Sequence, residues 1–189
     1  MIAHLCVLVR HGETEWSRNG RHTGRTDLPL ISEGENQAKA LAATVPAQEF
    51  ALILCSPLLR ARQTGELAGL GDGAVIDPDL AEWDYGEYEG LTTTEIRREW
   101  PGWDLFEDGA PGGESAEEVG SRADRVIERV RDAPGDVVCI AHGHLLRVLA
   151  ARWVGLEAQA ARYFALGPAS VSELSWERDQ PVIASWNLR

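Results

Sequence analysis

The sequence predicts an α/β fold in which a mainly parallel sheet lies between two layers of helices. Three short apolar runs have the length and β-branched content of buried parallel strands: Leu5 to Val9, Ala51 to Cys55 and Val137 to Ala141. Segments with helical spacing of apolar residues alternate with these runs, which is typical of a three-layer α/β/α arrangement. Polar or cationic residues follow each run at once. A ligand site is therefore expected at the carboxyl ends of the strands.

Two helices have clear start signals. Ser32 stands three residues before Glu35, and Ser115 stands three residues before Glu118. This is the spacing of a capping box, in which a hydroxyl and a carboxylate each accept a backbone N–H at the helix start. Apolar residues recur at helical intervals after both serines, and Pro134 ends the second pattern. We expect a helix after each capping box.

A further helix is expected to begin directly after the second strand. Ser56 is a suitable N-cap and Pro57 suits the first helical position, so Arg60 would lie close to the end of that strand. Near the end of the chain, helical spacing predicts one more helix, and two alternating stretches separated by a polar turn predict a hairpin or a pair of edge strands. These elements cover residues 144–155 for the helix, and 170–176 with 181–186 for the strands.

The length and composition fit one domain. The chain has 189 residues, of which 44% are hydrophobic and 25% are charged, as is ordinary for a globular protein with a sizeable core. Its middle part is rich in Gly, Pro, Trp and acidic residues and lacks a long hydrophobic period. We therefore expect a single domain over 1–189 with a lid-like insertion at about 78–113, which carries at most a short helix near Thr94 to Trp100.

The charge balance restricts the partners. A net charge of -12 argues against nucleic acid and against an anionic membrane surface, because both attract basic patches. A phosphorylated small molecule remains compatible, since charges farther apart than a Debye length of about 8 Å are largely screened and a few clustered arginines can dominate a cleft. No segment approaches the ~18 apolar residues of a membrane span, and we expect a cytoplasmic protein. The oligomeric state stays open, a homodimer included.

The three cysteines are expected to be buried free thiols. Cys6, Cys55 and Cys139 each lie inside one of the apolar runs that predict strands. Cysteines in such runs usually behave as small apolar core residues. This interpretation is favoured over disulfides, catalytic nucleophiles or metal ligands.

Cationic and hydroxyl side chains follow the three predicted strands, namely Arg10 and His11, Ser56 with Arg60, and His142 to His144. If the strands are neighbours, these groups converge, and they repel one another unless an anion holds them together. Phosphate fits best, because its charge is near -1.5 to -2 at neutral pH. Zinc bound by the two histidines of the HGH triplet is an alternative, although the nearby arginines would repel a cation. Ordinary capping or core histidines are the other alternative.

Six stretches in this order resemble the histidine phosphatase superfamily, in its phosphoglycerate mutase-like branch. They are VRHGETEW, TGRTDLPLISEGENQAKAL, CSPLLRARQT, EWDYGEYEG, PGGES and AHGHLLRVLA, and they extend over most of the chain. An RHG triplet alone would be weak evidence, whereas several ordered motifs are a strong signal. The resemblance implies the phosphoglycerate mutase-like fold and a phosphomonoesterase that needs neither metal nor cofactor.

The resemblance also implies a role for five residues. His11 would be the nucleophile that forms a phosphohistidine, which water then hydrolyses. Arg10, Arg60 and His142 would hold the phosphoryl oxygens. Glu82 matches the family position of the general acid that protonates the leaving group. Taken alone, Glu82 could equally be a solvated loop carboxylate.

Within the family, the pattern is most similar to the branch of sedoheptulose bisphosphatase and broad-specificity phosphatases, which implies a sugar phosphate or bisphosphate as substrate. Ser17 and His144 stand where mutases carry asparagine, so hydrolysis is favoured over phosphoglycerate mutase activity. A non-catalytic phosphate-binding module is a third alternative. Residues expected to border the substrate are Ser17, Arg21, His22, Thr23, Gly24, Gly143 and His144, with Trp83, Tyr85 and Trp103 closing over it.

Overall fold

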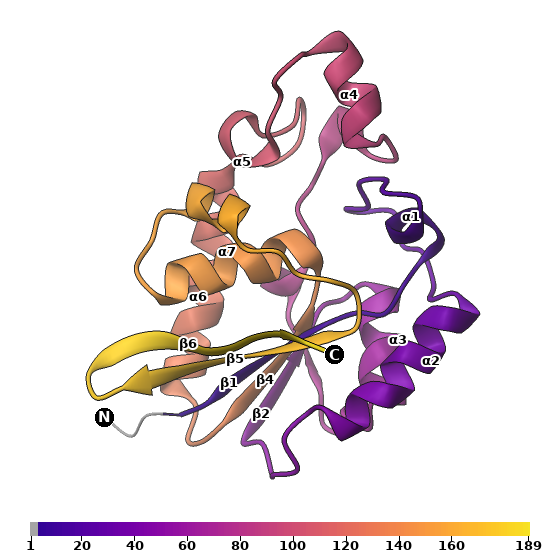
Figure 1. The fold of residues 1–189 in the computed structure, drawn as a ribbon. Coiled ribbons are helices and arrows are strands. Elements are labelled where there is room, and N and C mark those ends of the chain that lie inside the picture. Colours follow the sequence, from indigo (N-terminus) through magenta and orange to yellow (C-terminus); the bar gives the residue numbers. More distant parts are fainter. Residues whose placement is uncertain (1–3) are drawn as a thin grey trace.

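In the computed structural model, residues 4–189 are described, and six strands form one sheet (Figure 1). The strand order is β3-β2-β4-β1-β5-β6. The first four of these run parallel, and β5 and β6 form an antiparallel hairpin along β1. The bounds are β1 (Cys6–Arg10), β2 (Leu52–Cys55), β3 (Val75–Ile76), β4 (Val137–Ala141), β5 (Ser170–Glu177) and β6 (Gln180–Leu188). The predicted mainly parallel sheet and the C-terminal hairpin are confirmed.

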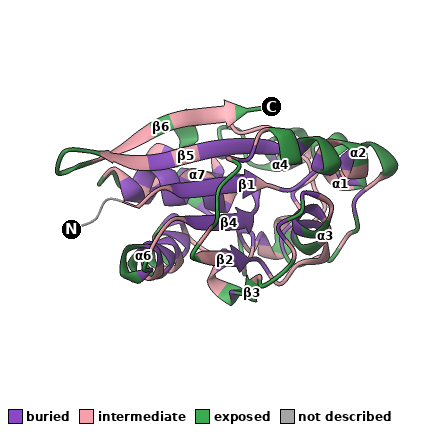
Figure 2. Ribbon diagram, turned by 90° about the horizontal axis from the view of Figure 1, so that it is seen from below, coloured by how far each residue is buried: buried purple, intermediate pink, exposed green. Residues whose placement is uncertain are grey.

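Helices cover both faces of the sheet. Helices α2 (Ser32–Ala40) and α3 (Leu59–Leu67) lie on one face, and α6 (Ala116–Asp132) and α7 (Gly143–Trp153) lie on the other (Figure 2). Successive side chains of β1 enter two different cores, with Cys6 and Leu8 on the side of α6 and α7. Val7 and Val9 belong to the core under α2 and α3. Both faces of the central strands are therefore buried, as a three-layer α/β/α fold requires.

The predicted helix starts are confirmed at one site and wrong at two. Ser115 and Glu118 form the capping box of α6. Helix α2 begins one residue too early for Ser32 to cap it, because the N-cap is Ile31, whose N–H donates to the carbonyl of Glu13. Helix α3 begins at Leu59, so Ser56 is not its N-cap. The Ser56 hydroxyl instead accepts a hydrogen bond from the His142 ring.

The middle segment, residues 78–113, is built from short helical pieces rather than one regular element. The expected short helix is present as α4 (Thr93–Glu99), and a second short helix and two 3-10 turns were not predicted. In Figure 1, α4 and α5 stand beyond the helices that cover the sheet. Trp83 and Trp103 of this segment are 0% and 1% exposed, and their indole N–H groups donate to the carbonyls of Glu114 and Gly109. The segment thus contributes to the core itself.

The remaining short elements connect these parts. They are α1 (Glu15–Arg18), η1 (Leu41–Ala43), η2 (Pro78–Leu80), η3 (Gly86–Tyr88), α5 (Leu105–Asp108) and η4 (Ala158–Tyr163).

All three cysteines are free thiols buried in the core, as predicted, and burial raises the pKa of Cys55 to about 12. Within residues 4–189, no helix has the length and apolar character needed to cross a membrane.

Candidate active site

The strand register brings the predicted catalytic residues together. Strands β1 and β4 are parallel neighbours, and Arg10 at the end of β1 lies opposite Ala141 at the end of β4. His11 and His142 are therefore the next residues of two adjacent strands, and their ring centroids are 5.0 Å apart. Strand β2, which lies on the other side of β4, delivers Ser56 to the same edge. The expected convergence at the carboxyl ends of the strands is confirmed.

The tautomer of His11 follows from the one hydrogen bond that its ring makes among the described residues. Its Nδ1 lies 2.7 Å from the carbonyl oxygen of Gly12. A carbonyl can only accept, so Nδ1 carries the proton and Nε2 keeps its lone pair. Burial, followed by the positive charges of Arg60 and Arg10, holds the pKa of His11 well below its ordinary value. His11 is therefore a neutral base with a free nitrogen at neutral pH.

Arg10 is held against the start of α7. One Nη1–H donates to the carbonyl of Leu166, and the buried Nε has no hydrogen-bond partner among the described residues. A Cβ on Gly143 would lie 3.0 Å from Arg10 Cζ, so the guanidinium rests on the glycine backbone. A buried N–H without a partner is costly. This donor therefore favours an anionic oxygen beside Gly143.

Arg60 and His142 are fully buried, and neither is among the residues that line the cavity next to His11. Arg60 Nε donates to His142 Nδ1 at 3.2 Å, so the proton of the neutral ring is on Nε2, which is 2.6 Å from Ser56 Oγ. Burial, with the charge of Arg60 next, holds the pKa of His142 well below its ordinary value. The ring is therefore fixed from two sides. Ser56, which was predicted as a helix cap, orients His142.

Glu82 reaches the site from the middle segment and sits at the start of α7. Its Oε1 accepts the N–H groups of Trp83 and Leu145, at 2.9 and 3.0 Å, and its Oε2 accepts the N–H of His144 at 3.1 Å. Each carboxylate oxygen has two lone pairs. Oε1 is therefore filled, whereas Oε2 retains one lone pair. With 7% exposure, Glu82 is not the solvated loop carboxylate of the alternative interpretation.

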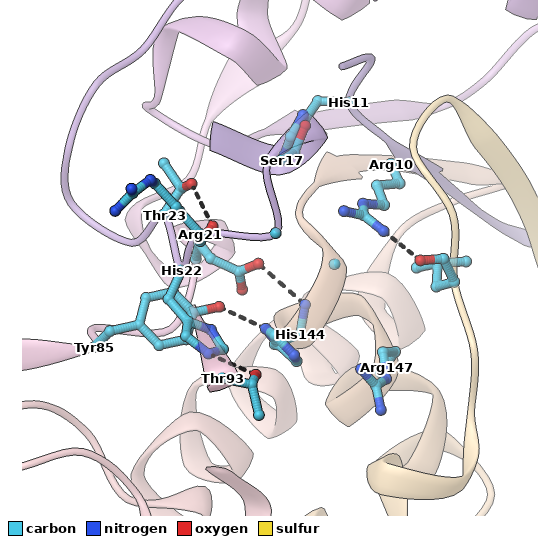
Figure 3. A pocket seen from close by; sticks show the side chains of 14 residues that line it. Arg10, His11, Ser17, Arg21, His22, Thr23, Tyr85, Thr93, His144 and Arg147 are labelled. Carbon is cyan, nitrogen blue, oxygen red and sulfur yellow. Dashed lines mark hydrogen bonds between the residues drawn. The ribbon is translucent and has the colours of Figure 1, made fainter. Parts of the chain in front are cut away.

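A cavity of about 240 Å³ opens beside these groups (Figure 3). Six of the seven predicted substrate-bordering residues line it, and Gly24 lies instead at a neighbouring cavity. A Cβ on Gly24 would come within 2.4 Å of the Trp83 carbonyl, so close backbone packing explains this glycine. The residues that line the catalytic cavity are Arg10, His11, Ser17, Gly20, Arg21, His22, Thr23, Glu82, Tyr85, Thr93, Gly143, His144, Arg147 and Leu166.

One wall of the cavity consists of aromatic rings. Tyr85 Oη is 2.5 Å from His144 Nδ1, and the His22 ring lies 4.8 Å from the Tyr85 ring. Burial lowers the pKa of His22 to about 4 and raises the pKa of Tyr85 well above its ordinary value. Burial also holds the pKa of His144 well below its ordinary value, so all three side chains are uncharged at neutral pH. Trp83 and Trp103, which were expected to close over the substrate, are not among the lining residues and pack behind this wall.

Arg147 is a lining residue that the sequence pattern had not singled out. It lies three residues after His144 on α7, so helical spacing brings both side chains to the same face. Its guanidinium also lies 4.6 Å from the Phe106 ring centroid. The AHGHLLR motif already indicated this position, because a helix places residues three apart on the same face and Arg147 comes three residues after His144.

The described residues offer no cation site that matches the zinc alternative. Within residues 4–189, no three His, Cys, Asp or Glu side chains gather in the way that a metal ion requires. The two histidines of the HGH triplet have different partners, since His142 contacts Ser56 and Arg60 whereas His144 contacts Tyr85. The arrangement of arginines and neutral histidines suits an anion.

Comparisons with known proteins agree on the family. A family model described as "Histidine phosphatase superfamily (branch 1)" matches residues 6–189. An acid phosphatase of Mycobacterium tuberculosis is 40% identical, over 92% of this chain and 87% of that protein. Sedoheptulose 1,7-bisphosphatase of Saccharomyces cerevisiae is 38% identical, over 82% of this chain and 69% of that protein. The solved structure of a mycobacterial glucosyl-3-phosphoglycerate phosphatase superposes with a TM-score of 0.87 at 32% identity, covering 99% of this chain and 100% of that chain.

Proposed function

Because the chain belongs to branch 1 of the histidine phosphatase superfamily, we propose that it hydrolyses phosphomonoesters through a phosphohistidine formed on His11. The observation that carries this proposal is the hydrogen bond from His11 Nδ1 to the Gly12 carbonyl, which leaves Nε2 unprotonated beside the cavity. A nucleophile must offer a lone pair at its working pH. The lowered pKa of His11 supplies one.

In the first step, cationic and N–H groups bind the phosphoryl oxygens. Arg10 offers its unpartnered Nε, and the guanidinium of Arg60 makes four hydrogen bonds within the protein, which leave one of its five N–H groups on Nη1 for the substrate. The His142 ring lies 5.0 Å from the His11 ring, and its Nε2–H, which donates to Ser56 Oγ in this structure, turns to a phosphoryl oxygen when the substrate binds. Charge stays on the equatorial oxygens during phosphoryl transfer, so fixed donors around them stabilise the transition state.

The covalent steps involve His11 and Glu82. His11 Nε2 forms the N–P bond while the bond from phosphorus to the ester oxygen breaks, and protonated Glu82 gives its proton to the leaving oxygen. The free lone pair of Glu82 Oε2 is the position for that proton. In the second half, the Glu82 carboxylate takes a proton from water, whose oxygen attacks phosphorus and breaks the N–P bond. Inorganic phosphate leaves, and His11 returns to its neutral state.

The substrate class that we propose is a small sugar phosphate or bisphosphate. The names of two similar proteins, a sedoheptulose bisphosphatase and a glucosyl-3-phosphoglycerate phosphatase, support this class. The lining of the cavity supports it too, because it carries hydroxyl and imidazole groups that can pair with sugar hydroxyls. These groups belong to Ser17, His22, Thr23, Tyr85, Thr93 and His144.

A cytoplasmic location is part of the proposal. It is supported by three free thiols, since reduced cysteines are usual in the cytosol.

The two alternatives from the sequence analysis are a phosphoglycerate mutase and a non-catalytic phosphate-binding module. A mutase would convert 3-phosphoglycerate into 2-phosphoglycerate, whereas a phosphatase would release inorganic phosphate and a binding module would leave the compound unchanged.

The test is phosphate release by the purified protein from an aryl phosphate and from a panel of sugar phosphates, with and without EDTA. We expect turnover in EDTA for the wild type and loss of at least about 1,000-fold in kcat for His11→Ala. The same assay with 3-phosphoglycerate separates hydrolysis from mutase activity. Full activity of His11→Ala, or an absolute requirement for added Mg²⁺, would contradict the proposed mechanism.

A further inference from the structure

A short loop, residues 23–26, lies between two side chains of opposite charge. On one side, the carboxylate of Glu89 accepts the N–H of Gly24 at 2.9 and 3.0 Å and the N–H of Thr26 at 3.0 Å. On the other side, the guanidinium of Arg60 donates to the carbonyls of Thr23, Gly24 and Thr26, each at 3.0 Å. The loop therefore turns its N–H groups toward the anion and its carbonyls toward the cation.

One peptide group makes both contacts. The carbonyl of Thr23 and the N–H of Gly24 belong to the same peptide plane, and they contact Arg60 and Glu89 respectively. A peptide whose N–H donates to a carboxylate is polarised, which makes its carbonyl oxygen a stronger acceptor. Charge-assisted hydrogen bonds at both ends are also stronger than neutral ones. The carboxylate of Glu89 therefore strengthens the hydrogen bond between Arg60 and the Thr23 carbonyl by polarising the one peptide group between them.

The positive charge of Arg60 is balanced by carbonyl dipoles and by more distant carboxylates rather than by a direct ion pair. It is fully buried, and no carboxylate of residues 4–189 forms an ion pair with it within 4.0 Å. Burial lowers the pKa of Arg60, while the charges of acidic neighbours, Glu82 first and Glu89 among them, raise it. A guanidinium without a direct counterion is available to an incoming anion.

Gly24 is required for this arrangement. A Cβ at this position would lie 2.4 Å from the Trp83 carbonyl and 2.8 Å from Glu89 Oε2. Only a residue without a side chain lets the peptide approach the carboxylate this closely. This explains why the TGRT stretch places a glycine beside, rather than in, the catalytic cavity.

We propose that Glu89 is a positioning residue, which orients and polarises the Thr23–Gly24 peptide so that Arg60 is held in place for the phosphoryl group. Glu89 does not line the catalytic cavity, so its effect on the reaction passes through the loop that it holds against Arg60. The inference rests on the proposed function, because it assumes that Arg60 binds the phosphoryl oxygens.

The test compares Glu89→Gln with a matched control, Glu87→Gln. The side-chain oxygen of the introduced glutamine can still accept from Gly24 and Thr26, so Glu89→Gln removes the charge and keeps most of the loop contacts. Glu87 is exposed, and no side-chain hydrogen bond or ion pair of it occurs in the described part of the chain. For Glu89→Gln we expect a roughly 10-fold fall in kcat/KM, mostly in kcat, and a similar weakening of orthovanadate inhibition. For Glu87→Gln we expect wild-type values.

A double-mutant cycle with Arg60→Lys separates positioning from a general structural role. If Glu89 acts through Arg60, Glu89→Gln costs much less in the Arg60→Lys background than in the wild type. Additive losses, or wild-type vanadate inhibition in Glu89→Gln with an unchanged unfolding midpoint, would overturn the inference. Failure of the proposed function looks different, because Arg60→Lys and His11→Ala would then retain full phosphatase activity.

Discussion

The strand ends and the middle segment contribute to the same cavity in different ways. Arg10, His11 and His142 lie at the ends of two adjacent parallel strands, and their positions come from the strand register. Glu82 and Tyr85 come from the irregular segment 78–113, and their positions come from contacts with distant parts of the chain. Glu82, for example, is held by backbone N–H groups at residues 144 and 145.

Local sequence therefore determines one part of the proposed chemistry, and long-range packing determines the other. The groups proposed to bind and attack phosphorus belong to strand ends, or, for Arg60, to the helix that follows β2, and short stretches of sequence specify them. The groups proposed to serve the leaving group and the rest of the substrate depend on long-range packing. Substitutions in the two regions should therefore have different consequences.

Glu82→Gln should separate leaving-group chemistry from phosphoryl binding. An amide cannot give a proton to the leaving oxygen, so we expect kcat to fall by about 100-fold for alkyl and sugar phosphates. Aryl phosphates with a good leaving group need no such proton, and their kcat should change little. The measurement is steady-state kinetics on both substrate types, with Glu87→Gln as control. Equal losses on both types would remove Glu82 from the role of general acid.

The His22 ring, which contacts Thr93 and Tyr85 of the middle segment, should make the free energy of unfolding fall at acidic pH. Its pKa is lowered by burial from about 6.5 to about 4, so the unfolded chain takes up the proton first as the pH falls. The contribution of His22 to the free energy of unfolding is therefore present above pH 6.5. About 2 kcal/mol of it is lost between pH 7 and pH 5. The measurement is urea unfolding of the wild type and of His22→Asn at pH 7 and pH 5. The fall in unfolding free energy between these pH values should be about 2 kcal/mol smaller in His22→Asn than in the wild type. The same loss in both proteins would contradict the assignment.

Gly143→Ala should lower activity without lowering stability. The new Cβ would press on the Arg10 guanidinium at 3.0 Å, and we expect kcat/KM to fall about 10-fold. Alanine has the higher helix propensity, so the unfolding free energy should be equal or greater. Gly120→Ala is the matched control, because this buried glycine of α6 would bring its Cβ within 3.1 Å of Ala158 in η4, and neither residue lines the cavity. Unchanged kcat/KM in Gly143→Ala would show that Arg10 does not depend on this contact.

Ser115→Ala should have the smallest effect on function. It removes the capping box of α6, which costs about 1 kcal/mol of unfolding free energy. The kcat/KM should stay at the wild-type value, since the cap belongs to neither region of the cavity. Ser121→Ala, on the exposed side of the same helix, should change stability by less than about 0.5 kcal/mol. A substantial loss of activity in Ser115→Ala would mean that α6 is coupled to the site.

The sequence predicted what depends on local pattern. Three apolar runs became β1, β2 and β4, and the residues after them converged as expected. Ser56 and Ser32 were misassigned because a serine before a helical pattern has the same local signature whether it caps the helix or serves another group. In Ser56 the hydroxyl is used by His142, which is 86 residues away in the sequence. The register of distant segments cannot be deduced from spacing alone.

The cavity wall was only partly predictable for the same reason. The tryptophans of the middle segment suggested substrate contacts, yet Trp83 and Trp103 pack in the core and Tyr85 lines the cavity. Nothing in the local sequence distinguishes these three positions. Arg147 was missed although its helical spacing from His144 was visible, and Glu89 was indistinguishable from its acidic neighbours until its backbone partners were known.

A rapid-quench experiment with a phosphomonoester labelled on phosphorus shows directly whether His11 carries the phosphoryl group. The alkaline quench preserves phosphohistidine, and the labelled protein is then digested and the modified peptide identified. We predict a label of up to one phosphoryl group per chain, located on His11, appearing before free phosphate and absent from His11→Asn. Turnover without protein-bound label, or label that remains in His11→Asn, would contradict the central claim that His11 is the nucleophile.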